Sequence, residues 1–480
     1  MLRIYNTLSK QVEEFKAVNP PEVRMYVCGP TVYDYSHIGH ARTYIVFDTF
    51  RKFLTYIGYN VKYVQNITDV DDKIINRANK EGMNPKELSE KFTREYFYDM
   101  KSLGIEIADI QPKVTEHIQD IIEIVKTLID KGFAYNVSGD VYFDVTKFSG
   151  YGKLSGQTLE DIKAGARVAI DERKRNPADF ALWKKAKPNE PFWDSPWGKG
   201  RPGWHIECSA MSMRYLEVPF DIHGGGQDLV FPHHENEIAQ SEAYSGKPFA
   251  NYWMHVGFLT VDGEKMSKSL GNFITIRDML KKYKKEAVRL LMLSTHYRSP
   301  LDFTWDKIEQ SDKSFRRLMN TIIKTNQILK EYDEIYPPHR LDDEALQDLN
   351  NVIMYENQFL KALNDDFNTP AALAALFNLV KFTNNYLERD KNNPALLLRI
   401  YGSLTDFASL FGILDETVLK KETVEMEELD RFIELLVSVR QKARSKKDWE
   451  LADYIREELK KLGIRIEDTK TGTKWMYLGQ

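Results

Sequence analysis

The sequence predicts an α/β protein: a Rossmann-like parallel-sheet domain that carries an insertion, then a helical domain and a small C-terminal α+β domain. Three observations lead to this prediction. A strand, a turn, a helix and a strand follow one another up to residue 67, apolar residues recur at helical spacing after about residue 310, and a hairpin pattern closes the chain. We expect domains at 1–310, 311–415 and 416–480, with the insertion at about 115–202.

The first domain opens with the pattern of a parallel sheet. Val23 to Val27 alternates like a short strand, and Cys28-Gly29-Pro30 ends it. Ile38 to Ile57 has a broad apolar face at helical spacing, Gly58 suits the end of that helix, and Val61 to Ile67 is typical of a second strand. In such sheets the ligand lies beyond the carboxyl ends of the strands, which is where Cys28 stands.

The insertion begins with a predicted helix at Glu116 to Lys131, followed by short strand-like pieces such as Gly139 to Val145. A basic, tryptophan-containing stretch, Arg173 to Trp197, ends it, and the sheet pattern resumes near Gly203. The insertion therefore interrupts the parallel sheet without belonging to it.

The rest of the chain is predicted to be mainly helical. Leucines and isoleucines between Leu346 and Leu363 recur at helical spacing, and Tyr336-Pro337-Pro338 marks a break between helices. The charged stretch Lys420 to Glu428 is expected to be a linker. Two more helices, near 429–439 and 448–462, precede a hairpin at Ile464 to Tyr477 with Gly472 in its middle.

Composition excludes several classes of protein. With 42% hydrophobic and 29% charged residues the chain is not disordered, and its net charge of −4 excludes a wholly basic nucleic-acid binder. No stretch approaches the roughly 18 apolar residues of a membrane span. We therefore expect a soluble, cytoplasmic protein that binds no membrane. In a reducing cytoplasm, the two cysteines are not expected to form a disulfide.

His37-Ile38-Gly39-His40 stands at the predicted start of the first helix. Backbone N–H groups at a helix start are unpaired and the helix dipole is positive there, which suits a phosphate. The two imidazoles lie on one face, and Gly39 leaves room for a base or a ribose. Taken alone, the four residues are equally consistent with a pair of surface histidines.

Lys265-Met266-Ser267-Lys268-Ser269 lies between Gly263 and Gly271, which suggests a mobile loop. Its two lysines would neutralise charge on a leaving pyrophosphate when the loop closes over a triphosphate. A solvated lysine loop is the plain alternative, because such loops are common.

A third group of residues is compatible with zinc. Cys28, Cys208, His233 and Glu237 offer two thiolates, an imidazole and a carboxylate. Pro232 suits the start of a helix, so His233 and Glu237 would share a face, although His234 could replace His233 on spacing alone. Without further context, unrelated core and surface residues would explain the same set.

The two phosphate motifs together resemble the class I aminoacyl-tRNA synthetases, with both motifs intact. Cys28 to Tyr33 and Phe231 to Glu237 resemble the cysteinyl-tRNA synthetase family within that class, and the likeness extends over essentially the whole chain. It also covers three further segments, namely Asn66 to Ile74, Asp221 to Asp228 and Asp448 to Tyr477.

The resemblance implies a ligase that activates cysteine with ATP and magnesium, transfers it to the tRNA for cysteine, and binds one zinc per chain. The implied zinc ligands are Cys28, Cys208, His233 and Glu237. The implied catalytic residues are His37, His40, Lys265 and Lys268, and Gly39 and Asp228 join them in binding the nucleotide. The implied cysteine pocket contains Cys28, Thr68, Trp204 and His223, the last of these in a glycine-rich turn that leads to Asp228. We further expect a monomer.

A metal would give this chemistry its selectivity. Cysteine and serine differ by one atom, and size alone separates such pairs only about 10–200-fold, whereas zinc binds a thiolate far better than a hydroxyl. Four protein ligands leave no open position on a tetrahedral zinc, so either a five-coordinate site or weak binding by Glu237 is implied.

Two rival functions stay open at this stage. One is a cysteine ligase of the same fold that acts on a small amine, against which residues 310–480 argue. The other is a non-catalytic RNA-binding or zinc-stabilised paralogue, whose phosphate motifs should have decayed.

Overall fold

The computed structural model describes residues 1–161, 173–332, 341, 343–469 and 472–477. The chain forms two compact units. The first contains residues 1–312, 354–376 and 410–412, and the second contains residues 313–353, 377–409 and 413–480. Within the described ranges, no helix is long and apolar enough to cross a membrane.

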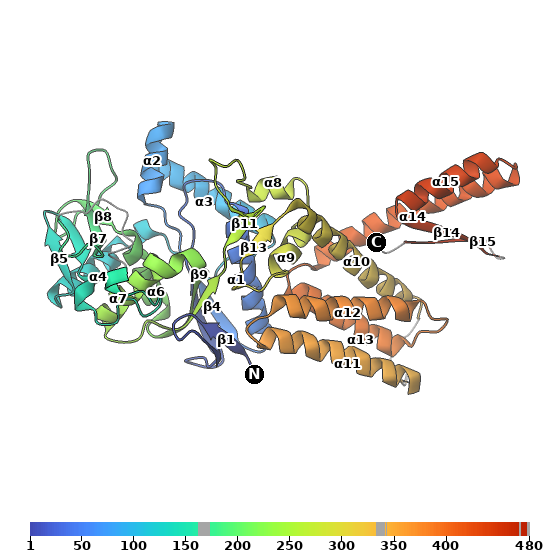
Figure 1. Cartoon of the computed structure of the whole chain (residues 1–480), viewed down its shortest axis with the longest axis horizontal. Helices are drawn as coiled ribbons and strands as arrows, with labels where there is room; N and C mark the ends of the chain where they lie inside the picture. Colours follow the sequence, from blue (N-terminus) through green and yellow to red (C-terminus); the bar gives the residue numbers. More distant parts are fainter. Residues whose placement is uncertain (162–172, 333–340, 342, 470–471, 478–480) are drawn as a thin grey trace. The chain divides into compact units, whose positions relative to one another are not determined.

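A four-stranded parallel sheet forms the centre of the first unit, which confirms the predicted α/β class (Figure 1). Its strands are β3 (Glu22–Val27), β4 (Asn60–Val64), β9 (Phe220–Gly226) and β10 (Ala250–Val256), in the order β10-β9-β3-β4. Strand β4 ends at Val64, three residues earlier than predicted, and beyond it Ile67 forms only an isolated bridge to Lys113.

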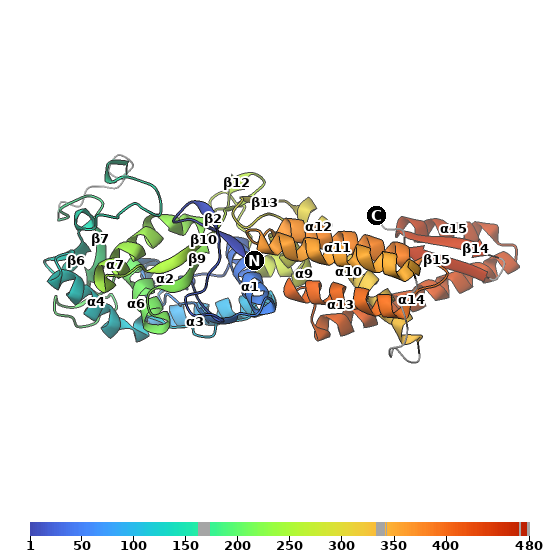
Figure 2. The same ribbon diagram turned by 90° about the horizontal axis from the view of Figure 1, so that it is seen from below.

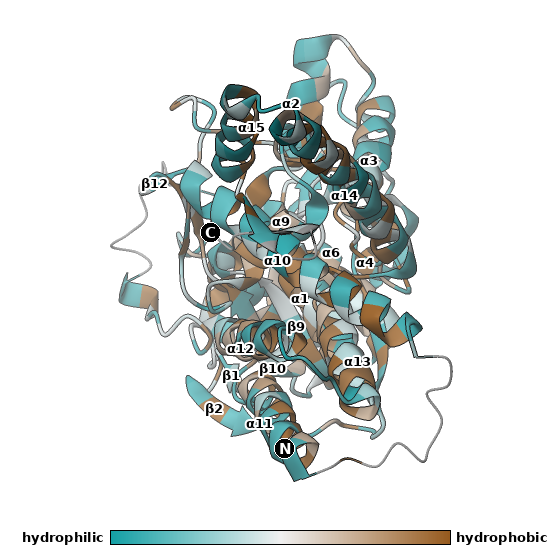
Figure 3. Cartoon of the chain, turned by 90° about the vertical axis from the view of Figure 1, so that its right-hand side faces the viewer, coloured by the Kyte–Doolittle hydropathy of each residue, from teal (hydrophilic) through white to brown (hydrophobic). Residues whose placement is uncertain are grey.

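Helix α1 (Ile38–Tyr56) connects β3 to β4 and ends within one residue of the predicted position. Phe47, Phe50 and Phe53 are fully buried, and the left-handed φ of +100° at Gly58 ends the helix as a glycine can. In Figure 3, α1 and β9 carry mostly white to brown, apolar colours, while much of the outer helix α2 (Asp72–Glu81) is teal. This packing fixes the start of α1 above the carboxyl ends of the strands.

The insertion folds as a separate antiparallel sheet. Helix α4 (Ile118–Asp130) precedes β5 (Ala134–Val137), β6 (Asp140–Phe143), β7 (Phe180–Lys185) and β8 (Gly200–Pro202), which pair in that order. The parallel sheet resumes at Phe220 rather than near Gly203, because Trp204–Leu216 forms helix α6 first.

The other strands and α-helices that the structure describes within residues 1–312 lie outside the parallel sheet. They are the strands β1 (Arg3–Asn6), β2 (Gln11–Glu14), β11 (Leu259–Val261), β12 (Glu264–Lys265) and β13 (Leu301–Phe303), and the helices α3 (Pro85–Ser102), α7 (Glu235–Ser245), α8 (Ile276–Leu280) and α9 (Lys285–Leu293). Strand β11 pairs with both β12 and β13, so the lysine loop grows out of a small three-stranded sheet.

The later part of the chain is helical, as predicted. Its helices are α10 (Trp305–Lys330), α11 (Asp343–Asn364), α12 (Thr369–Leu387), α13 (Pro394–Leu410), α14 (Glu416–Ser445) and α15 (Trp449–Lys461). The predicted break at 336–338 lies outside the described residues. The predicted linker, Lys420 to Glu428, is wrong: the stretch lies within α14, since its Glu, Lys and Met residues favour helix.

The end of the chain forms a small core of its own. The hairpin strands β14 (Ile464–Thr469) and β15 (Gly472–Tyr477) pair as predicted and lie beside α15 (Figures 1 and 2). The Arg440 guanidinium holds both carboxylate oxygens of Asp468 at 2.9 and 3.0 Å, which joins α14 to β14. The core residues are Ile433, Val437, Ile455, Leu459, Ile464 and Ile466.

Candidate active site and metal centre

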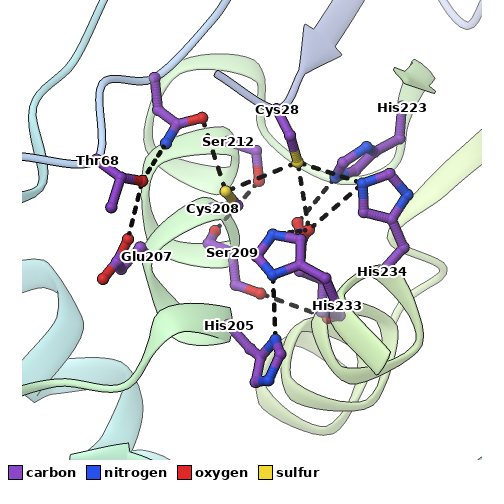
Figure 4. Close-up of polar contacts among 12 residues, drawn as sticks. Cys28, Thr68, His205, Glu207, Cys208, Ser209, Ser212, His223, His233 and His234 are labelled. Atoms are coloured by element: carbon purple, nitrogen blue, oxygen red, sulfur yellow. Dashed lines mark hydrogen bonds and ion pairs between the residues drawn. The ribbon is translucent and has the colours of Figure 1, made fainter. Parts of the chain in front are cut away.

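Four predicted ligands meet at the carboxyl ends of the parallel strands. Cys28 follows β3, Cys208 lies on α6, and His233 and Glu237 stand at the entrance of α7. Their ligand atoms all lie within 4.8 Å of one another, all four residues are buried, and the two sulfur atoms are 3.8 Å apart. Figure 4 shows the Cys28, Cys208 and His233 side chains turned toward a common centre. Residues separated by about 200 positions are thus brought into one cluster.

His233 and Glu237 face each other across one helical turn. The chain enters α7 through the segment Val230–His234, in which Phe231 has extended backbone angles, and His233 Nε2 lies 3.0 Å from Glu237 Oε1. Burial lowers the pKa of His233, but the Glu237 carboxylate and the Cys208 sulfur outweigh burial and raise that pKa to about 10. Burial would raise the pKa of Glu237, yet His223 and His233 lower it to about 2. Without a metal the pair is therefore ionised, and His233 must release its proton before its Nε2 can bind a metal ion.

Both of these ligands have an outer partner that fixes their orientation. His223 Nε2 lies 2.8 Å from Glu237 Oε2, so the other carboxylate oxygen, Oε1, faces the sulfur atoms. His205 Nδ1 lies 3.1 Å from His233 Nδ1, which leaves Nε2 of His233 toward the cluster. Such partners commonly orient the residues that bind a metal.

The two thiols ionise unequally. Burial, followed by the Cys208 sulfur, raises the pKa of Cys28. Burial would also raise the pKa of Cys208, but its contacts with Cys28 and His233 lower that pKa to about 6. Cys208 therefore loses its proton first, and both thiols must be ionised to bind a metal.

A second, overlapping set of possible ligands contains Cys28, His223, His234 and Glu237. His234 Nε2 lies 3.2 Å from Cys28 Sγ, while its Nδ1 lies 2.8 Å from His255 Nε2. We favour the first set because it supplies two thiolates, and soft sulfur ligands select zinc over the hard cations. Its donor types, burial and outer partners all fit a zinc ion.

The start of α1 is capped by its own histidines. His37 Nδ1 accepts the backbone N–H groups of Gly39 and His40 at 3.1 and 3.4 Å, and His40 Nδ1 accepts the N–H of His37 at 3.3 Å. The expectation of unpaired N–H groups is therefore wrong at Gly39 and His40. Glycine is needed at position 39, since an added Cβ would lie 2.9 Å from the His37 ring.

Both imidazoles of this motif are neutral. Burial and the nearby Lys268 lower the pKa of His37 to about 4, and burial followed by His37 lowers the pKa of His40. Because Nδ1 of each ring accepts a hydrogen bond, the single proton of each ring resides on Nε2. The motif therefore presents two N–H donors without a positive charge.

Asn272 holds the two sides of the lysine loop together. Asn272 Oδ1 accepts the N–H of Ser267 at 2.8 Å, and its side-chain amide donates to the carbonyl of Lys265 at 3.3 Å. Lys265 is exposed on β12. The Lys268 ammonium pairs with the carboxylate of Asp34, which lies just before the histidine motif. The loop thus lies against the same end of α1 as His37.

Thr68 and Trp204 lie beside the buried cluster of cysteine, histidine and glutamate. Thr68 is buried, donates to Glu207 at 3.1 Å, and accepts from Asn66, whose carbonyl oxygen lies 3.7 Å from Cys208 Sγ. The Trp204 ring centre is 4.3 Å from that of His233. The structure therefore brings both residues to the edge of the metal-compatible cluster.

The segment from His223 to Gly226 belongs to strand β9, so the predicted glycine-rich turn is wrong. Glycine is needed there because an added Cβ at Gly224 would lie 2.3 Å from the ring of Phe47 on α1. Asp228 follows the strand in a 3-10 turn and is exposed.

Three protein families match successive parts of the chain. They are the tRNA synthetases class I (C) catalytic domain at residues 14–313, the DALR domain at 358–415 and the cysteinyl-tRNA ligase anticodon binding domain at 426–475. The cysteine–tRNA ligase of Thermococcus gammatolerans is 53% identical over 475 residues, covering 99% of this chain and 98% of the relative. That of Carboxydothermus hydrogenoformans is 53% identical over 480 residues, covering 99% of each. The chain belongs to the cysteine–tRNA ligase family.

Solved structures of other class I synthetases share the fold of this family member. Methionyl-tRNA synthetase of Mycobacterium tuberculosis, in complex with methionyl-adenylate, has a TM-score of 0.59 at 14% identity over 87% of this chain and 94% of that one. The LeuRS–tRNA–LeuAMS complex from Agrobacterium radiobacter K84 has a TM-score of 0.65 at 12% identity over 85% and 86%. At these sequence identities, the two comparisons show a shared fold and nothing about substrates.

Several residues around the site of this cysteine–tRNA ligase family member were not assigned a role from the sequence. His205 and His255 lie around the metal-compatible cluster, and Asn66 and Asp34 contact Cys208 and Lys268. His234, which the sequence offered only as a replacement for His233, lies 3.2 Å from Cys28 Sγ. A high local density of histidine between 205 and 255 is the signal that could have pointed to His205 and His255. The contacts of Asn66 and Asp34 depend on packing between distant elements and leave no local pattern.

Proposed function

We propose that this protein is a cysteine–tRNA ligase. The cysteine carboxylate attacks the α-phosphate of ATP, giving cysteinyl-adenylate and pyrophosphate, and a hydroxyl of the terminal ribose of the tRNA then attacks the adenylate and releases AMP. The observation that carries the proposal is the buried Cys28–Cys208–His233–Glu237 cluster beside two phosphate motifs, in a chain that belongs to this family over its full length.

Activation depends on positioning and electrostatics. We propose that the Nε2–H donors of His37 and His40 bind phosphate oxygens of ATP, and that magnesium is bound by the same triphosphate. Lys268 and Lys265 neutralise charge that develops on the pyrophosphate. To do so, Lys268 must leave its ion pair with Asp34 and bind the phosphates instead. Gly39 and Asp228 contact the nucleotide. No protein nucleophile is required, because attacking and leaving groups come from the substrates.

Cysteine is selected by its sulfur. We propose that Cys28, Cys208, His233 and Glu237 hold one zinc ion, which when bound supplies a Lewis-acid centre for the substrate thiolate. His223 holds Glu237 in place, and Thr68 and Trp204 line the pocket beside the cluster. A serine hydroxyl would gain little from such a site, since it is a poor ligand by comparison.

The later residues are proposed to bind the tRNA. Residues 1–310 carry out catalysis, with the insertion at about 115–202, and 311–415 and 416–480 hold the anticodon side. The match of residues 426–475 to an anticodon binding domain favours tRNA over a small amine as the acceptor. We propose a monomer, because all the proposed catalytic and metal-binding side chains come from one chain. We propose a cytoplasmic location, because charged tRNA is used there in translation.

The test measures the two half-reactions separately. Cysteine-dependent exchange of labelled pyrophosphate into ATP is expected, with serine giving little. Labelled cysteine is then incubated with total tRNA and the charged species is identified. Absence of pyrophosphate exchange would refute the proposal. Exchange without charging of tRNA would indicate that the acceptor is a small amine.

A further inference from the structure

A buried arginine of α1 reaches the base of the lysine loop. Arg42 is 1% exposed, and its guanidinium donates to the carbonyl of Phe258 at 2.7 Å, to that of His296 at 3.3 Å and to that of Ser299. Phe258 precedes β11, from which the chain runs into the lysine loop, and Ser299 lies shortly before β13. Strands β11 and β13 are parallel neighbours in the same small sheet. One side chain therefore holds both strands at their starting points.

The other end of the loop is held by the backbone of the same helix. The N–H of Ile38 donates to the carbonyl of Ile274 at 3.1 Å, and the N–H of Ile276 donates to the carbonyl of Ser36 at 3.0 Å. The segment 257–276, which contains the lysine loop, is thus attached to the start of α1 at both of its ends. His37 lies between Ser36 and Ile38, and His40 lies between Ile38 and Arg42, so both histidines stand next to these attachments.

We propose that Arg42 is a positioning residue that sets the lysine loop in register with the histidine motif. It does not touch the substrates. It acts through the three carbonyl groups, so that Lys268 closes onto the same phosphates that His37 and His40 bind. This inference rests on the proposed function, because register between the two motifs matters only when they share one triphosphate.

The geometry requires a guanidinium. Arginine presents five N–H donors in a rigid planar fork, whereas a lysine ammonium is a single point on a flexible stem. Three carbonyls on two separate segments suit the fork, so Arg42→Lys would keep the charge and lose the simultaneous contacts. A misplacement of about 1 Å between reacting groups can cost about 100-fold in rate.

The experiment is a double-mutant cycle on the full-length, zinc-loaded enzyme. The single-turnover rate of adenylate formation is measured for wild type, R42K, K268A and the double variant, together with the equilibrium affinity for cysteine. R42K is expected to slow the rate about 10–100-fold and to leave cysteine affinity within about twofold. In the K268A background R42K should cost less than about threefold, because the lysine whose position Arg42 sets is gone.

The matched control is R51K on the same helix, since Arg51 binds the carbonyl of Ile107 and the carboxylate of Asp109 far from the loop. Its rate should stay within about twofold of wild type. Losses that multiply in the double variant would overturn the proposal, as would an unchanged rate in R42K. Absence of exchange in the wild type would instead refute the proposed function.

Hydrogen exchange of R42K gives a readout that does not depend on activity. Peptides from 257–276 are expected to lose protection while strands β9 and β10 keep theirs. Equal loss across the parallel sheet would mean that Arg42 supports the whole fold, and the positioning role would be refuted.

Discussion

At the scale of single residues, hydrogen bonding determines the chemistry of the histidine motif. His37 uses Nδ1 to cap its own helix, and His40 uses Nδ1 to accept the N–H of His37. Each ring can therefore offer only Nε2–H to a phosphate. Positive charge must then come from the lysine loop, where Lys268 pairs with Asp34.

Lys268→Ala is expected to slow adenylate formation by about 10²–10³, because the charge that it neutralises develops on pyrophosphate in the transition state. Cysteine affinity should remain nearly unchanged, since the amino acid is proposed to bind at the metal-compatible cluster. Single-turnover kinetics and equilibrium binding measure the two effects, with the exposed Lys281→Ala as control. A collapse of cysteine affinity with an intact rate would show that Lys268 has another role.

The purified protein is expected to contain about one zinc per chain, and Cys208→Ser should lose most of it because a hydroxyl replaces a thiolate ligand. Elemental analysis of both proteins provides the measurement. Ser212→Ala, one turn further along α6, should retain the metal, since Ser212 donates only to the carbonyl of Ser209. Active enzyme without zinc would falsify the metal assignment.

The burial of His37, together with the nearby Lys268, predicts a pH dependence of stability. Its folded pKa of about 4 lies below the unfolded value of roughly 6.5, so above pH 6.5 both states are neutral and the residue adds no pH dependence. Between pH 6.5 and 4 the unfolded chain binds a proton that the folded chain excludes. This group's contribution to stability therefore falls with decreasing pH, by up to about 1.4 kcal/mol per unit.

His37→Asn should weaken this dependence, because asparagine caps a helix without titrating. The free energy of unfolding is measured by denaturant titration at pH 7 and pH 5. The variant should lose less stability than wild type over this interval, while an equal loss would mean that His37 is protonated in the folded state.

At the scale of elements, close contact between α1 and β9 places the histidine motif over the sheet. Gly224→Ala would put a methyl group 2.3 Å from the Phe47 ring, and such overpacking typically costs about 1–3 kcal/mol. Phe47→Leu in the same chain should recover part of the loss. The control is Gly402→Ala, where an added Cβ meets nothing within 4 Å in helix α13. Thermal denaturation distinguishes the cases, and a neutral G224A would contradict the packing argument.

Sequence patterns predict the elements here more reliably than the contacts between distant elements. The apolar face of residues 38–57 predicted α1 almost to the residue, and the position of Cys28 after a strand predicted the correct end of the sheet. The charged stretch 420–428 was misassigned because helical propensity and linker composition look alike in Glu- and Lys-rich sequence. The contacts of Arg42 and His223 join distant segments, so local periodicity contains no trace of them.

At the scale of the whole molecule, the first unit does not end with the parallel-sheet region. Residues 354–376 and 410–412 belong to it. Asp366 accepts from the N–H of Tyr5 at 2.7 Å, and the carbonyl of Phe411 accepts from the buried Arg289 at 2.8 Å. A fragment that ends near residue 310 would lose these partners, so it is expected to be unstable.

A fragment of residues 1–415 keeps both of these contacts and every proposed catalytic residue, and it removes the segment that matches the anticodon binding domain. It should catalyse cysteine-dependent pyrophosphate exchange at a rate close to that of the full chain. It should charge tRNA poorly, because binding energy from remote parts of a substrate positions its reacting end. Exchange and charging are measured on the same preparation after circular dichroism shows that it is folded. Undiminished charging would mean that residues 416–480 do not hold the anticodon side of the tRNA.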